Sequence, residues 1–172
     1  MLWEFHRSWS PHGVDRFYQL VRSGYYDGNR FFRVVPGRWA QFGINGDPNI
    51  ANEWRKQSIP DDPRVESNVR GTIAYAFAVT NGRTTQLFIN LKDNRATHDK
   101  EPFVPIGKVV QGMEVADALY SGYGEKSGGG IRAGHQDAMF EGGNAYLDAN
   151  FPLLDRIERT TVLEDQQRSD KR

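Results

Sequence analysis

The chain has 172 residues, no cysteine, and 22 basic residues balanced by 22 acidic ones. This length is sufficient for one domain with a sizeable core, and the lack of cysteine excludes a disulfide framework and thiolate chemistry. A surface dedicated to nucleic acid usually carries a basic excess, so the zero net charge argues against a nucleic-acid partner.

No apolar run approaches the roughly 20 residues that cross a membrane, and the N-terminus lacks the apolar region of a secretory signal. The composition leaves the compartment open, with the cytoplasm as the default. Residues 164–172 are polar throughout. We therefore expect one domain over residues 1–163, followed by a frayed polar tail over 164–172.

The first predicted elements are a short strand over residues 1–5 and a helix that begins at Ser10-Pro11. Serine is expected to accept a hydrogen bond at the N-cap, and proline suits the first helical position. Gly24 is the expected C-cap. Apolar residues recur between them at helical spacing, at Val14, Phe17, Tyr18 and Val21.

Residues 31–43 alternate, break at a Pro-Gly pair, and alternate again. This pattern predicts two short strands around a tight turn. Because successive side chains point to opposite faces of a strand, we expect Arg33, Trp39 and Gln41 on one face. A guanidinium, a flat apolar ring and an amide in one shallow site can hold a peptide and polarise one carbonyl or amide. The segment offers no obvious nucleophile, base or metal ligand.

The later elements are mostly strands. Residues 73–79 alternate large apolar residues with alanine, which predicts a strand with two unlike faces, and residues 86–91 are a candidate buried strand. Residues 113–120 carry a second helical stripe, and Ile157, Thr161 and Leu163 suggest a closing strand. Many short strands with two separated amphipathic helices are typical of a mainly β fold, a closed barrel capped by helices.

Other patterns carry little chemistry. The glycines at 128–130 lack the residues of a phosphate-binding loop, and Asp61-Asp62 between two prolines is typical of a solvated turn. We identify no chemistry in the run 119–125. Four histidines are scattered without the paired spacing of a metal site, so neither a metal nor a cofactor is predicted: His6, His12, His98 and His135.

Three segments resemble the cyclophilin-type peptidyl-prolyl isomerases. Residues 31–43 are similar to the family's Phe-His-Arg-Val-Ile-Pro-Gly-Phe-Met-x-Gln-Gly-Gly strand pair. Residues 71–76 and 85–89 resemble its Gly-x-x-x-Met-Ala and Ser-Gln-Phe-Phe-Ile stretches. Residues 106–113 resemble the Phe-Gly-x-Val-x-x-Gly-Met entry into its last helix. The segments occur in the family's order and cover much of the chain from about residue 31 to 120.

The resemblance implies an eight-stranded antiparallel barrel with a helix over each opening and the active groove on the outer wall. The family has an additional strand before the one that matches Leu2–Phe5, and this chain begins too late to supply it. An unpaired edge invites another strand. We expect the gap to be covered by a later segment of the chain, by water, or by a partner protein.

The resemblance also implies an activity, the acceleration of rotation about X-Pro bonds in peptides or unfolded proteins. Arg33, Gln41 and Phe88 would be the catalytic set. The backbone around Phe77 would align the residue before proline. The substrate-binding residues would be Trp39, Arg38, Phe77, Ala76, Gln86, His98 and Phe103.

Several positions depart from the family pattern. Phe32 replaces a histidine, Arg38 a phenylalanine, and Trp39 a methionine. His98 stands near the pocket's usual leucine, and Phe103 matches a pocket histidine. The alternative function is therefore a catalytically weak or inactive binding module, or a scaffold subunit of a larger assembly. For single residues the alternatives are an ordinary surface ion pair for Arg33 and core packing for the aromatic rings.

Overall fold

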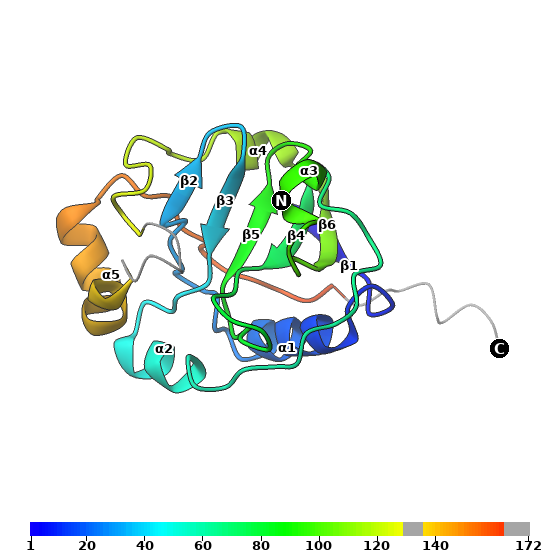
Figure 1. Cartoon of the computed structure of the whole chain (residues 1–172). Coiled ribbons are helices and arrows are strands. Elements are labelled where there is room, and N and C mark those ends of the chain that lie inside the picture. Colours follow the sequence, from blue (N-terminus) through cyan, green and yellow to red (C-terminus); the bar gives the residue numbers. More distant parts are fainter. Residues whose placement is uncertain (129–135, 164–172) are drawn as a thin grey trace.

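The protein is described by a computed structural model over residues 1–128 and 136–163. Figure 1 shows one sheet with helices around it. The six strands that pair in the described residues follow the order β1-β6-β4-β5-β3-β2, and every pair is antiparallel. The strands are β1 (Leu2–Phe5), β2 (Arg33–Val35), β3 (Trp39–Phe42), β4 (Thr72–Tyr75), β5 (Leu87–Asn90) and β6 (Pro105–Gln111). The helices are α1 (Pro11–Arg22), α2 (Pro48–Trp54), α3 (Arg95–His98), α4 (Met113–Asp117) and α5 (Asp137–Asn150).

The sheet buries side chains on both faces. On one face, alternate residues of the central strands enter the main core against α1: Ala40, Phe42, Ile73, Tyr75, Leu87 and Ile89. On the other face Ala74, Ala76 and Phe88 form a smaller cluster with Trp39 and Phe103. The two unlike faces predicted for residues 73–79 are thus confirmed over β4, and they follow from the period of two in a strand.

The sheet is open rather than closed. Among residues 1–128 and 136–163, β1 is hydrogen-bonded only to β6, and β2 only to β3, so these two strands are the edges of the sheet. The closed barrel of about eight strands is therefore not confirmed, because the two edge strands do not pair with each other. The unpaired edge that we expected beside Leu2–Phe5 is present.

The C-terminal segment packs beside β2. Its backbone pairs with the residues that precede β2: Gly28 N donates to Ile157 O at 2.7 Å, and Phe31 N donates to Asp155 O at 2.9 Å. Ile157 and Val162 pack against the main core, and in Figure 1 the segment runs in orange and red from the α5 side toward the β1 side. Pairing is limited to one bridge at residue 156, and residues 158–163 form no strand, so the predicted closing strand is wrong beyond that bridge.

The N-terminus of α1 is capped across the chain rather than by its own serine. Ser10 makes no side-chain cap. Its hydroxyl donates to Asp62, and the Asp62 carboxylate accepts from the backbone N–H groups of His12 and Gly13 at 3.2 and 3.0 Å. Asp62 is 5% exposed, so the prediction of a solvated turn is wrong at this residue. A buried carboxylate satisfies the free N–H groups and also favours the positive end of the helix.

The sequence prediction missed α2 and α5. α2 has the expected start, Asp47 at the N-cap and Pro48 after it, but Ala51 is its only buried residue, so it shows no apolar stripe. α5 contains two adjacent glycines, and Gly143 has φ of 55°, which kinks the helix. The predicted helix at 113–120 is shorter in the structure, as α4.

No helix of the described residues is long and apolar enough to cross a membrane. The predicted tail 164–172, two of the three clustered glycines and His135 lie outside the described residues.

Arg83 has the largest fully buried side chain among the described residues, and it carries a charge. Its side chain is 0% exposed. Nη2 lies 3.1 Å from Asp62 Oδ2, and Nε lies 3.2 Å from Asp61 Oδ1. A second contact of Nη2 with the Pro60 carbonyl ties the same turn to the strand region before β5. Arg83 therefore neutralises the carboxylate that caps α1.

Replacing Arg83 with methionine should lower the free energy of unfolding by about 3–5 kcal/mol, because it leaves Asp62 buried without its cation. Urea unfolding followed by circular dichroism measures the change. The matched control is Arg95→Met, which removes an arginine from an exposed pair with Asp93 and should leave the midpoint nearly unchanged. Equal midpoints for the two variants would contradict a structural role for the buried pair.

Candidate functional site

The β2–β3 hairpin brings three of the predicted residues together. Its register pairs Arg33 with Gln41 and Val35 with Trp39. Arg33 Nη1 donates to Gln41 Oε1 at 3.1 Å, and Arg33 Cζ lies 5.0 Å from the centre of the Trp39 ring. The predicted shared face is therefore observed, and the catalytic role of these residues stays a prediction.

Buried glutamines form the base of the site. Gln41 Nε2 donates to Gln86 Oε1 at 2.9 Å, and Gln86 Nε2 donates to Gln136 Oε1 at 2.7 Å. All three are at most 4% exposed. Arg33 fixes the direction of this series of hydrogen bonds, because only the oxygen of the Gln41 amide can face a guanidinium. Gln136 was not predicted, since it lies 50 residues from its partner in the sequence.

An apolar wall stands beside the arginine. Phe88 contacts His98 and Phe103 edge-on, with ring centres 5.2 and 5.4 Å apart. Phe77 packs on Phe103 at 4.6 Å, and Ala76 lies in the same cluster as Phe88. The predicted wall residues thus form one cluster on the face of the sheet opposite α1, and their substrate-binding role stays a prediction. Such ring pairs contribute about 0.5–1.5 kcal/mol beyond burial.

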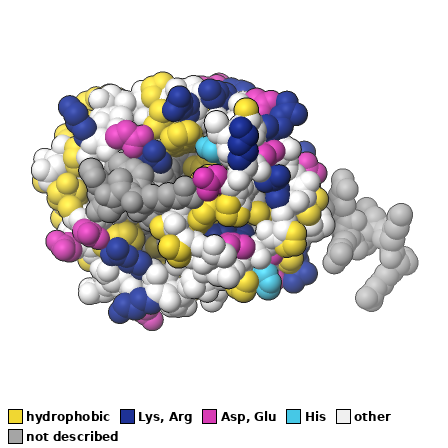
Figure 2. Space-filling model, in the orientation of Figure 1, with side chains coloured by type: hydrophobic (Ala, Val, Ile, Leu, Met, Phe, Trp, Pro, Cys, Tyr) yellow, Lys and Arg dark blue, Asp and Glu magenta, His cyan; other side chains and the backbone are white. Residues whose placement is uncertain are grey.

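Arg38 lies at the margin of the site. It is exposed in the turn between β2 and β3, and its Cζ is 5.8 Å from the Trp39 ring. Trp39 therefore contacts a second guanidinium besides Arg33. Figure 2 shows hydrophobic side chains in a hollow over the sheet, with basic and acidic side chains at its border.

The surroundings of His98 disfavour the charged form of its ring. Its Nδ1 lies 3.2 Å from Asn90 Oδ1, and the Asn90 amide nitrogen donates to Thr72 Oγ1, so Nδ1 is the protonated nitrogen. Burial lowers the pKa of His98; Asp99 opposes this shift and the charge of Arg33 adds to it. In the neutral ring Nε2 is then an acceptor beside the aromatic wall.

Glu125 is a second residue of the site, besides Gln136, that the sequence did not predict. Its carboxylate accepts from Arg33 Nε at 2.7 Å and from Nη2 at 2.9 Å. The two residues are 92 positions apart, and their separation in space cannot be obtained from the sequence alone. The run 119–125, to which we assigned no chemistry, therefore supplies a charge to the site.

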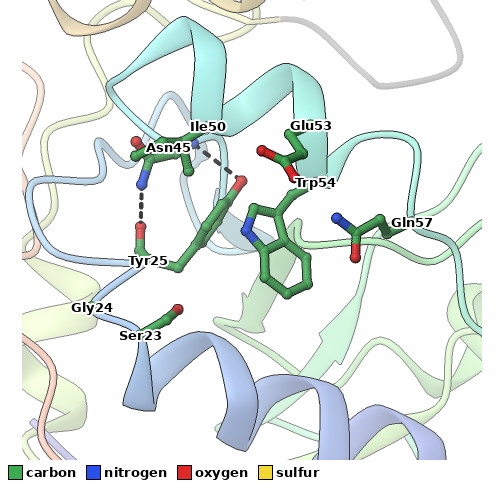
Figure 3. Close-up of a pocket in the computed structure, with 8 residues that line it drawn as sticks. All are labelled: Ser23, Gly24, Tyr25, Asn45, Ile50, Glu53, Trp54 and Gln57. Carbon is green, nitrogen blue, oxygen red and sulfur yellow. Dashed lines mark hydrogen bonds between the residues drawn. The ribbon is translucent and has the colours of Figure 1, made fainter.

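A separate cleft of about 300 Å³ lies between the end of α1 and α2. Figure 3 shows Trp54 and Tyr25 on its walls, with Asn45 Nδ2 donating to Tyr25 O at 2.6 Å. None of its lining residues belongs to the predicted site. Within residues 1–128 and 136–163, no group of three or more His, Cys, Asp or Glu side chains could hold a metal ion.

Comparison with known proteins identifies the family. The family model described as "Cyclophilin type peptidyl-prolyl cis-trans isomerase/CLD" matches residues 3–132, which is more than half of the chain. The chain belongs to the cyclophilin family. The cyclophilin resemblance of residues 31–43, 71–76, 85–89 and 106–113 is thereby confirmed.

Several relatives carry isomerase names, and two of them illustrate the match. "Peptidyl-prolyl cis-trans isomerase A" of Dickeya dadantii is 34% identical over 119 residues, which cover 64% of this chain and 60% of the relative. "Peptidyl-prolyl cis-trans isomerase cyp18" of Streptomyces antibioticus is 33% identical over 139 residues, covering 74% and 78%. The chain thus spans less than two thirds of the Dickeya relative's length.

A solved cyclophilin supports the fold. The crystal structure of a Cryptosporidium parvum cyclophilin type isomerase, determined in the presence of the dipeptide Ala-Pro, superposes with a TM-score of 0.56. It is 23% identical, and the match covers 75% of this chain and 84% of that one. A mainly β, antiparallel cyclophilin-like architecture with helices is therefore shown for this member of the family.

The ring of His98 should titrate below its usual value of about 6.5, because burial beside Arg33 disfavours the imidazolium. As the pH falls, the unfolded chain takes up this proton before the folded one does. The stability linked to His98 is therefore fully present above about pH 6.5 and declines as the pH falls through that value. An NMR titration of its Cε1–H signal, assigned with His98→Gln, gives the midpoint. A midpoint at or above 6.5 would contradict the buried, neutral ring.

Proposed function

We propose that this chain catalyses cis-trans isomerisation of X-Pro peptide bonds in peptides or unfolded proteins. The observation that carries the proposal is the guanidinium of Arg33, which lies on the outer face of the sheet beside Trp39 and is 19% exposed. A substrate can reach a group with this exposure. We also propose that residues 1–163 form a single domain around this site.

The chemistry requires no covalent step. Amide resonance gives peptide-bond rotation a barrier of about 18–20 kcal/mol. In the twisted amide the nitrogen becomes pyramidal and basic, and a nearby guanidinium donor stabilises it. Each tenfold acceleration requires about 1.4 kcal/mol of preferential binding to this transition state. No cofactor is needed for such a reaction.

The surrounding residues have distinct proposed roles. Gln41 would hold the substrate backbone, and Gln86 would orient its amide through their 2.9 Å hydrogen bond. Phe88, Phe103 and the neutral His98 would form the proline pocket, whose apolar rings exclude water. Phe77 and Ala76 would align the residue before proline from the segment that follows β4. Arg38 would charge the entrance.

A second candidate function rests on the open edge of β1. No other strand of the described residues pairs with this edge, so its backbone groups can accept a strand from another protein. The chain would then serve as a binding module or scaffold subunit with little turnover. Activity of the isolated, monomeric chain in a protease-coupled assay on an Xaa-Pro peptide separates the two functions.

Arg33→Ala should lower kcat/KM by roughly 10²-fold or more, as loss of an electrostatic donor typically does. The protease-coupled assay measures it. The matched control is Arg7→Ala, which removes an exposed arginine paired with Asp15 near the start of α1. Unchanged turnover in a folded Arg33→Ala protein would remove Arg33 from the mechanism.

Arg38 should give acidic peptides an advantage, because its exposed charge lies beside the pocket. The ratio of kcat/KM for peptides with Glu or Lys before proline should exceed one at low salt and fall as salt is added. Arg38→Phe should shift the preference toward apolar peptides. Equal rates for the two charged peptides at low salt would argue against this role.

A further inference from the structure

The ion pair between Arg33 and Glu125 has the geometry of a clamp. Both carboxylate oxygens accept from one edge of the guanidinium, Oε2 from Nε at 2.7 Å and Oε1 from Nη2 at 2.9 Å. Bidentate pairs of this kind fix the plane of the guanidinium as well as its position. On another side the same group donates through Nη1 to Gln41 at 3.1 Å.

The loop that carries Glu125 is itself anchored on both sides of that residue. Two positions later, the buried Ser127 hydroxyl donates to the Phe32 carbonyl at 2.6 Å, directly before Arg33. Two positions earlier, the Tyr123 ring packs on Phe151 at 5.1 Å. A turn closes between them, with Lys126 N donating to Tyr123 O at 3.0 Å. The carboxylate is therefore held at Arg33 by its backbone and not only by charge.

The clamp leaves donors for a substrate. In the described part of the chain, three of the guanidinium's five N–H donors are engaged, two with Glu125 and one with Gln41. Glu125 reduces the local positive charge, but its side chain is 55% exposed, so solvent screens this effect. The orientation that Glu125 gives to the guanidinium is not screened by solvent. We therefore expect this orientation to matter more for catalysis than the positive charge that Glu125 cancels.

We propose that Glu125 is a positioning residue for Arg33, which sets the plane of the guanidinium for the twisted amide. This inference rests on the proposed isomerase function. It assigns Glu125 no contact with substrate, so its loss should act on the rate of the bound complex and hardly on peptide binding.

The kinetic test compares Glu125→Ala and Glu125→Gln with Asp15→Asn. Asp15 is a matched control, because its carboxylate is also 55% exposed and also accepts twice from one arginine, Arg7. Glu125→Ala should lower kcat roughly 10-fold with KM changed less than about twofold. Glu125→Gln keeps one acceptor oxygen, so its kcat should lie between that of Glu125→Ala and that of the parent protein. Asp15→Asn should keep the parent kcat, and the melting temperatures of all the variants should be similar.

Arg33→Ala, measured in parallel, separates the two ideas. If Arg33→Ala is slow but Glu125→Ala keeps or exceeds the parent kcat, the isomerase function stands and the positioning role is overturned. A Glu125→Ala effect confined to KM overturns it as well, because a contact with substrate would then be lost.

A second readout does not need turnover. In ¹⁵N NMR, the Nε–H of Arg33 should give a sharp, slowly exchanging signal in the parent protein, assigned with Arg33→Lys. The signal should broaden or exchange faster in Glu125→Gln and stay unchanged in Asp15→Asn. If the parent protein shows no turnover, the isomerase proposal fails and this signal alone decides whether Glu125 orders Arg33. An equally protected Nε–H in Glu125→Gln overturns the clamp.

Discussion

The pairing of β3 with β2 on one side and β5 on the other is the constraint on which the site depends. Because side chains alternate along a strand, the register that pairs Arg33 with Gln41 also turns Ala40 and Phe42 into the main core. A slip of one residue would turn the guanidinium into that core and turn the Phe42 ring out of it. The burial of the core thus places Arg33 and Gln41 together on the opposite face of the sheet, without any interaction specific to a substrate.

The polar groups of the site form a line of hydrogen bonds that all run in the same donor-to-acceptor order away from Arg33 toward Gln136, with Glu125 as an acceptor at the other end. It begins at the Glu125 carboxylate, continues through Arg33 and Gln41, and ends in the buried amides of Gln86 and Gln136. Each amide orientation follows from its neighbour, since an oxygen must face each donor. The Trp39 ring lies beside this line and helps to bury the Arg33 side chain, which is 19% exposed, and a partly buried donor interacts more strongly than one in water. The hydrogen bonds and the neighbouring aromatic ring therefore both act on the guanidinium of Arg33.

A similar solution appears at the start of α1. A carboxylate from a distant turn, Asp62, replaces the local serine cap, and the buried Arg83 neutralises it. In both places a charge is satisfied by a partner far away in the sequence. At α1 the removal of Arg83 is costly, because Asp62 then remains in a poorly solvated position, whereas the Glu125 side chain is 55% exposed. The edge strand β1 differs from these two places, since water can satisfy the backbone groups along its edge.

The sequence by itself determined the family, the strand pair of residues 31–43, the helix after Ser10, and the shared face of Arg33, Trp39 and Gln41. These features depend on local alternation and spacing, which act over a few residues. It did not determine α2 or α5, because one lacks an apolar stripe and the other contains a glycine pair. Only the tertiary structure decided that the sheet stays open, that Asp62 caps α1, and that Glu125 and Gln136 reach the site. The contacts of Asp62, Glu125 and Gln136 join residues 49 or more positions apart, and no local pattern encodes which distant partner a charge or an amide will meet.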